Sequence, residues 1–318
     1  MVLPTLQTFE DPPRPSRLRW IVTASVILAL VGLIVWAAHR WGSESRTVPP
    51  APPSHDTVPT PPSPPPAKPQ TVSEPDPNVQ ELLARAEELE RAERLSEARE
   101  LLLAFCQANP QTAGIAQIEA KVGDLAIRLA FNPYPMPEKQ EVVVGPGDSL
   151  DRISRRFGTT AELTATNNRI ANPHLIKQGD RLRVLSGEFK VIVNKTRNDL
   201  TLTLNGRFFK RYPVGTGKFG RTPVGTFVIS DRIAEPPWWR PDGKVIPYGD
   251  PENILGTRWL ALKPTGDTPP VSGYGLHGTW DETTIGKAES AGCIRLRNQD
   301  IEELYLLLPI GTTVTIEE

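Results

Sequence analysis

The uneven placement of proline most limits how this chain folds. Of 34 prolines among 318 residues, 13 lie between positions 49 and 77. Proline fixes φ and lacks an amide hydrogen, so this stretch cannot build a core and favours extended polyproline II structure. Residues 39–77 are therefore predicted to be a linker, with binding of a partner domain as the alternative. Folded modules are expected only on either side of it.

A charge-free apolar segment precedes the linker at residues 20–38. Nineteen helical residues at about 1.5 Å each span about 28 Å, close to the hydrocarbon thickness of about 30 Å. Arg14, Arg17 and Arg19 precede the segment, which places residues 1–19 in the cytoplasm. The prediction is a single-pass anchor in the cytoplasmic (inner) membrane, with the rest of the chain extracytoplasmic. A cleaved signal peptide is the alternative, although residues 37–39 make a poor cleavage site.

Overall charge and the small number of cysteines and histidines exclude several classes of protein. The formal net charge is -1, from 36 basic and 37 acidic residues, which offers no electrostatic case for nucleic acid. The two cysteines are far apart in sequence and do not indicate a disulfide framework. The four histidines form no recognisable ligand pattern with other residues, so neither a metal nor another cofactor is expected.

Residues 78–131 carry apolar side chains at helical spacing. Runs of this kind start at Val79 and Leu95, a break follows at Asn109-Pro110, and another amphipathic stretch starts at Ile115. The pattern is weakly tetratricopeptide-like, but one repeat is too few for such an array. We expect a helical hairpin that acts as a spacer or docking surface.

The chemistry of the chain is concentrated near its C-terminal end. Cys293 lies in the sequence Ser-Ala-Gly-Cys-Ile-Arg at 290–295, and His277 precedes Gly278. An imidazole that receives the thiol proton makes cysteine a nucleophile and later protonates a leaving amine. Gly292 lets the backbone bend, so that the N–H groups of Gly292 and Cys293 are candidates for binding an oxyanion. The alternative is a buried structural cysteine and histidine.

The segments around this pair resemble the catalytic domain of L,D-transpeptidases, the YkuD-type domain. The resemblance covers 188–318 and rests on residues 212–217, 222–227, 247–251, 255–259, 274–279 and 285–295. It implies a mainly β, sandwich-like fold and a Cys293 acyl-enzyme, with His277 as base and the Gly278 carbonyl orienting the imidazole. It assigns Gly292, Ser290, Arg295, Arg258 and Tyr274 to the oxyanion and substrate side. Ala291 stands where most family members have histidine.

Residue patterns support the mainly β prediction independently. Alternating apolar residues predict strands at 189–193 and 200–204, and Asn205-Gly206 predicts a hairpin turn. Further strands are expected at 224–230, 259–262 and 312–316, and a helix at 300–308. The long segment 234–254 carries Trp238, Trp239 and Tyr248, and is predicted either to roof a cleft or to cover a sheet edge.

Residues 141–185 form a second module, with a strand, two capped helices and a closing strand. Its order and spacing resemble the LysM domain, a small βααβ fold that binds glycans containing N-acetylglucosamine. The resemblance implies a sugar groove between two loops. These loops contain Gly147, Asp148, Ser149 and Leu150, and Asn172, Pro173, His174, Leu175 and Ile176.

Together these features predict an anchored enzyme that cross-links peptidoglycan, with stem peptides and glycan strands as partners. Cys293 would attack the carbonyl between the third and fourth residues of a stem tetrapeptide, and an amine from a second stem would take the acyl group. An L,D-carboxypeptidase, in which water takes the acyl group, is one alternative. A catalytically inactive wall-binding protein is another.

Overall fold

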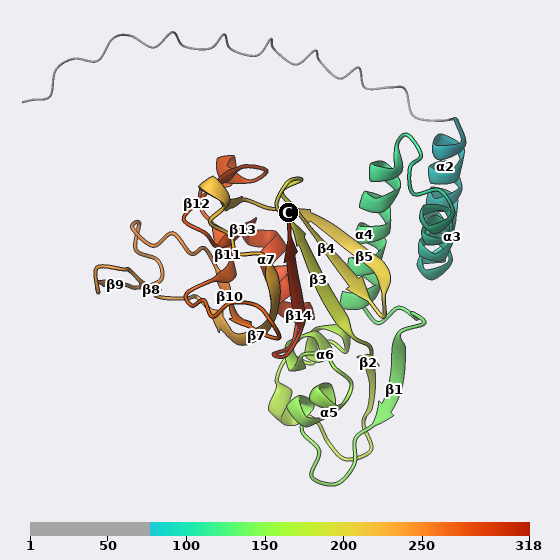
Figure 1. Cartoon of the computed structure of the whole chain (residues 1–318). Helices are drawn as coiled ribbons and strands as arrows, with labels where there is room; N and C mark the ends of the chain where they lie inside the picture. Colours follow the sequence, from blue (N-terminus) through green and yellow to red (C-terminus); the bar gives the residue numbers. More distant parts are fainter. Residues whose placement is uncertain (1–76) are drawn as a thin grey trace, which may run out of the picture. The chain divides into compact units, whose positions relative to one another are not determined.

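The computed structural model describes residues 77–318 (Figure 1). The predicted cytoplasmic tail (1–19), the predicted anchor (20–38) and all but the last residue of the predicted linker (39–77) lie outside the described residues. Within 77–318, no helix combines the length and the apolar character needed to cross a membrane.

The first module contains three helices, so the predicted helical hairpin is wrong by one helix. They are α2 (Pro77–Arg91), α3 (Leu95–Ala108) and α4 (Ile115–Phe131). The break at Asn109-Pro110 ends α3, and Gly114, at φ 90°, allows the chain to turn into α4. α4 buries Ile118, Val122 and Leu125. It packs against both α3 and the strand β5 (Arg207–Pro213).

The second module has the βααβ order predicted for residues 141–185. It consists of β1 (Lys139–Val143), α5 (Leu150–Arg156), α6 (Ala161–Asn167), the short 3-10 helix η1 (Pro173–Leu175) and β2 (Arg181–Leu185). The two strands pair antiparallel. Ser149 caps α5 and Thr160 caps α6 by accepting backbone N–H groups. The module has a small core of its own that includes Ile153 and Val184.

The third module is mainly β, as predicted. Hydrogen bonding joins its long strands into one eight-stranded sheet. Its strands are β3 (Phe189–Asn194), β4 (Asp199–Leu204), β5, β7 (Gly225–Ala234), β10 (Arg258–Pro264), β11 (Gly275–Thr279), β13 (Ile294–Arg297) and β14 (Thr313–Glu317). Across the sheet their order is β13-β11-β10-β7-β14-β3-β4-β5. The predicted Asn205-Gly206 turn is confirmed, because both residues have positive φ and join β4 to β5.

Short elements outside this sheet surround the functional residues. Two-residue strands β8 (Trp238–Trp239) and β9 (Val245–Ile246) form a hairpin, while β6 (Thr216–Gly217) pairs with β12 (Ala288–Ser290). The predicted helix is α7 (Asn298–Leu307), which buries Ile301, Leu304 and Leu307 and packs against β10, β11 and β13. α7 therefore supports β11, which carries His277, and β13, which begins at the residue after Cys293.

Candidate active site

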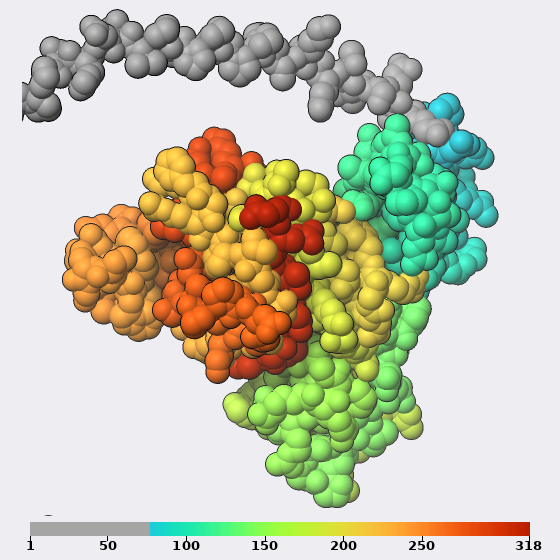
Figure 2. All heavy atoms as spheres, in the orientation of Figure 1, coloured from blue at the N-terminus to red at the C-terminus, as the bar shows by residue number. Residues whose placement is uncertain are grey.

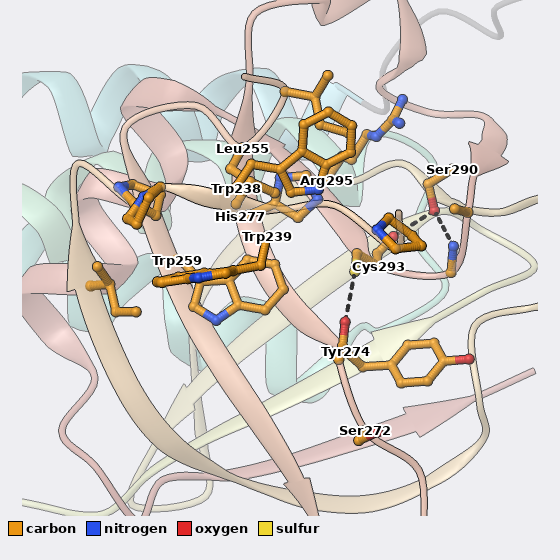
Figure 3. Close-up of a pocket in the computed structure, with 18 residues that line it drawn as sticks. Trp238, Trp239, Leu255, Trp259, Ser272, Tyr274, His277, Ser290, Cys293 and Arg295 are labelled. Carbon is orange, nitrogen blue, oxygen red and sulfur yellow. Dashed lines mark hydrogen bonds between the residues drawn. The ribbon is translucent and has the colours of Figure 1, made fainter. Parts of the chain in front are cut away.

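A parallel pair of strands brings the predicted base and nucleophile to one cavity. β11 pairs with β13 so that His277 is opposite Arg295. Cys293 lies in the bend directly before β13, two residues before Arg295, and it lines the same cavity as His277. Figure 3 shows the three side chains around one pocket.

The pocket is a cavity of about 560 Å³. His277, Cys293 and Arg295 line it, together with apolar residues of the 234–254 segment, including Trp238 and Trp239. The structure thus places both tryptophans against the cleft. Tyr248 lies elsewhere, with its ring centroid 6.4 Å from that of Trp280.

His277 is buried and held in a defined orientation. Its Nδ1 lies 2.6 Å from the Gly278 carbonyl oxygen, and its ring stacks on Trp259 with centroids 5.6 Å apart. A proton on Nδ1 that is donated to this carbonyl leaves Nε2 as the acceptor. Burial lowers the pKa of His277 to about 4, against a smaller opposing effect of the Gly278 hydrogen bond. The imidazole is therefore neutral at neutral pH.

Cys293 is also in its neutral form. Burial raises the pKa of the Cys293 thiol, although a backbone hydrogen bond from Gly275 and the charge of Arg295 oppose this effect. Its Sγ donates to the Gly273 carbonyl at 3.5 Å. Since burial disfavours both charged forms, the resting pair is a thiol and a neutral imidazole.

Ser290 shapes the turn that presents the thiol. Its Oγ donates to the Cys293 carbonyl at 2.7 Å and accepts the Gly292 N–H at 3.0 Å. This Gly292 N–H was expected to bind an oxyanion, but here it is engaged within the turn. Gly292 has φ 145°, and a Cβ there would lie 2.7 Å from the Tyr274 ring, so the site requires glycine. Ala291 is exposed and lines the cavity.

Thr222 supports the same turn; in the sequence it was named only as the first residue of the 222–227 motif, with no role at the site. It is fully buried, and its Oγ1 donates to the Gly292 carbonyl at 2.8 Å and accepts the Gly217 N–H at 2.7 Å. Thr222 is 71 positions from Cys293 along the chain, and no local pattern indicates that they meet.

The two arginines expected on the substrate side occupy different environments. Arg295 lines the cavity, whereas Arg258 donates to the Thr257 carbonyl and lies over the Tyr305 ring, 5.3 Å from its centroid. Arg258 is not among the residues that line the cavity, so the structure does not bring it together with the others.

Asn298, the first residue of α7, braces the segment that orients the imidazole. Its Oδ1 accepts the Thr257 N–H at 3.1 Å. It also fills a notch that two glycines leave: a Cβ on Gly278 would lie 2.2 Å from this oxygen, and one on Gly256 would lie 2.3 Å from it. Asn298 thereby packs on the residue whose carbonyl holds His277. In the sequence, only the presence of a polar residue near the start of a predicted helix pointed to Asn298.

The residues predicted for the sugar groove lie in the second module, away from the catalytic cavity. Gly147 has φ 73°, Ser149 caps α5, and Asn172 Oδ1 accepts the His174 N–H. Leu175 is 68% exposed, but Leu150 is packed in the module's core and cannot offer its side chain to a sugar. The remaining predicted groove residues, which lie in the same two loops, are Asp148, Pro173 and Ile176.

Comparison with known proteins identifies both modules. Residues 188–316 match the L,D-transpeptidase catalytic domain (YkuD), and residues 142–185 match the LysM domain. YkuD of Bacillus subtilis (strain 168), named as an L,D-transpeptidase, is 38% identical over 185 residues, which cover 54% of this chain and 96% of that protein. The chain belongs to the L,D-transpeptidase family. YqjB, a B. subtilis protein with the same type of name, is 39% identical over 135 residues, covering 42% of this chain and 74% of that protein.

In this L,D-transpeptidase, residues 77–318 contain no group of three or more His, Cys, Asp or Glu side chains placed to hold a metal ion. The polar side chains that line the cavity include those of the Cys-His pair, Arg295, Ser272, Tyr274 and Ser290, and the backbone of the turn lies beside them. This set suits nucleophilic acyl transfer, which needs a thiol, a base and hydrogen-bond donors for the developing oxyanion.

Proposed function

We propose that this L,D-transpeptidase cross-links peptidoglycan through an acyl-enzyme on Cys293. The observation that carries the proposal is that His277, on β11, and Cys293, in the bend before β13, line one cavity of about 560 Å³. His277 has a fixed tautomer there, because the Gly278 carbonyl holds Nδ1. We assign the other ring nitrogen, Nε2, to the thiol.

In the first step, the Cys293 sulfur attacks the carbonyl between the third and fourth residues of a stem tetrapeptide. The thiol proton moves to His277 Nε2 as the carbon–sulfur bond forms. Proton transfer accompanies attack, because neither side chain is charged at rest. We assign the oxyanion to backbone N–H groups of the turn, with Cys293 first, since the Gly292 N–H already donates to Ser290.

In the second step, the tetrahedral intermediate collapses to a thioester. The C–N bond breaks, and the departing D-alanine amine takes the proton from the imidazolium. An amine of a second stem then attacks the thioester, loses a proton to His277, and forms the cross-link while the thiol is restored. Water in place of that amine gives a trimmed tripeptide, which is the carboxypeptidase alternative. Arg295 is assigned to a carboxylate of the substrate, since it lines the same cavity.

We further propose that the LysM module binds glycan strands and that residues 20–38 anchor the chain in the cytoplasmic membrane, with the enzyme outside it. The module match at 142–185 supports the first proposal. The second rests on sequence alone. A tether and a glycan-binding module would both raise the enzyme's concentration at its polymer.

The chain's two cysteines allow a controlled test of the nucleophile. Full-length protein is incubated with a carbapenem, which acylates a reactive thiol, and the adduct is located by mass spectrometry. We expect an adduct in the wild type and in Cys106→Ala, and none in Cys293→Ala. An adduct that persists in Cys293→Ala, or none in the wild type, would contradict the proposal and favour an inactive wall-binding protein. With stem tetrapeptide alone, cross-linked dimers indicate transfer and tripeptides alone indicate hydrolysis.

A further inference from the structure

The β8–β9 hairpin carries an indole ring that is both part of the cavity wall and open to solvent. Trp239 lines the cavity with Cys293, yet the residue is 63% exposed. In Figure 1 the hairpin projects beyond β7 and β10, and in Figure 2 the same segment forms an orange lobe of the surface. A large exposed aromatic beside a reactive group is typical of a surface that binds a ligand.

A single buried side chain holds this hairpin in place. Asn253 is 1% exposed, and its Nδ2 lies 2.9 Å from the Pro236 carbonyl, 3.2 Å from that of Ile246 and 3.1 Å from that of Pro247. Its Oδ1 accepts the Leu255 N–H at 2.9 Å. One side-chain amide thus links the residues before β8, the strand β9 and the residues that follow the hairpin. The position of Trp239 is therefore preorganised, which reduces the entropy lost when a ligand binds.

The hairpin segment that carries the ring also carries paired charged side chains. Arg240 pairs with Asp242 at 2.9 Å, and Glu252 accepts from both Arg240 and Lys244. An apolar protein surface laid over the ring would bury these charges at a cost. A sugar suits such a surface, because a pyranose has an apolar C–H face for the indole and hydroxyl groups at its edge for the charged side chains.

A second aromatic pair is connected to the same anchor. Tyr248 follows Pro247, whose carbonyl Asn253 holds, and its ring lies 6.4 Å from that of Trp280. Trp280 is 55% exposed. The pair of Tyr248 and Trp280 therefore adds aromatic surface at a second place.

We propose that the β8–β9 hairpin is a glycan-binding platform of the catalytic domain, on which Trp239 stacks against an N-acetylhexosamine ring of the strand that carries the donor stem. The inference rests on the proposed function, because a stem peptide in the cavity is attached to such a strand. About three extended residues, or roughly 10 Å, separate the reacting carbonyl from the sugar. The platform adds a second glycan contact to that proposed for the LysM module.

The test compares two donors in the full-length protein: a stem tetrapeptide, and the same tetrapeptide carrying its N-acetylhexosamine disaccharide. The readout is the ratio of kcat/KM for the two donors. In the wild type we expect this ratio to exceed one. Trp239→Ala is expected to lower it about tenfold, in line with the contribution of one aromatic stacking contact. Trp239→Phe is expected to retain most of it.

Val245→Ser is the matched control, because Val245 is opposite Trp239 in the hairpin and is also exposed. This variant should keep the wild-type ratio, and thermal melting of all variants identifies any that misfold. A wild-type ratio of one, or equal losses for both donors in Trp239→Ala, would overturn the proposal, the latter by showing that the ring only roofs the cavity. A wild type inactive on both donors would instead overturn the proposed function.

Discussion

At the residue scale, the Cys-His pair is controlled by burial. A thiolate–imidazolium pair needs both charged forms to be stabilised, but burial raises the pKa of Cys293 and lowers that of His277 to about 4. The charge of Arg295 favours the thiolate and opposes the imidazolium, so it cannot stabilise the pair as a whole. The pair therefore resembles a hydroxyl nucleophile with its general base more than a preformed thiolate.

This electrostatic state predicts an unusual pH dependence of acylation. The neutral imidazole is the competent base, and its protonation stops the reaction. The acid limb of the carbapenem acylation rate should therefore lie near pH 4, well below the ordinary value for histidine. Arg295→Gln should move the limb to higher pH, because the Arg295 charge lowers the pKa of His277. Acylation rates measured by mass spectrometry between pH 3.5 and 8 locate this acid limb. A midpoint near pH 6.5 would contradict the prediction, because it is the value of a solvated imidazole.

At the scale of single elements, the start of α7 fixes the geometry of the base. Asn298→Ala removes the oxygen that fills the notch at Gly256 and Gly278, and frees the Thr257 N–H. The Gly278 carbonyl then loses its support. A shift of the imidazole on the order of 1 Å costs up to about 100-fold in rate, so we expect kcat to fall by about tenfold or more with KM little changed. Asn298→Asp retains the acceptor oxygen and should recover part of the rate.

The neighbouring Gln299 supplies the control for this experiment. It is exposed on the same helix, so Gln299→Ala should leave both kcat and the melting temperature near their wild-type values. If Asn298→Ala raised KM alone, or changed kcat no more than Gln299→Ala does, Asn298 would not be a positioning residue for His277.

The sequence predicted those elements in which apolar residues recur at a regular spacing or capping residues mark the ends. Strands such as β3 and β4 alternate, α7 has helical spacing, and the βααβ module has two capped helices. Two-residue strands such as β8 have too few residues for any period. The contacts of Thr222 with Gly292 and of Asn298 with Thr257 join positions 70 and 41 residues apart, which no local pattern reveals.

At the scale of the whole described chain, one apolar cluster has members in all three modules, while the LysM module also keeps a smaller core of its own. Leu102 of α3, Leu163 of the LysM module and Phe209 of β5 belong to the same buried cluster. Sequence analysis separated the modules by composition and motif, and it treated the helices as a spacer or docking surface. In the structure α4 packs against β5, the last strand of the sheet, and so protects an edge that would otherwise be open to pairing.

A buried arginine at this junction allows the role of the helices to be tested. Arg99 is 0% exposed; it donates to Glu138 at 3.1 Å and lies over the Phe209 ring, 5.9 Å from its centroid. Arg99→Ala leaves the Glu138 carboxylate buried without its partner, which costs about 3–5 kcal/mol of unfolding free energy. Arg94→Ala, which breaks an exposed pair with Glu97 on the same module, should leave the free energy of unfolding close to that of the wild type. Urea unfolding of both variants measures these costs. Equal small losses would mean that the helices are a spacer after all, whereas a large loss for Arg99→Ala alone would make them part of the catalytic body.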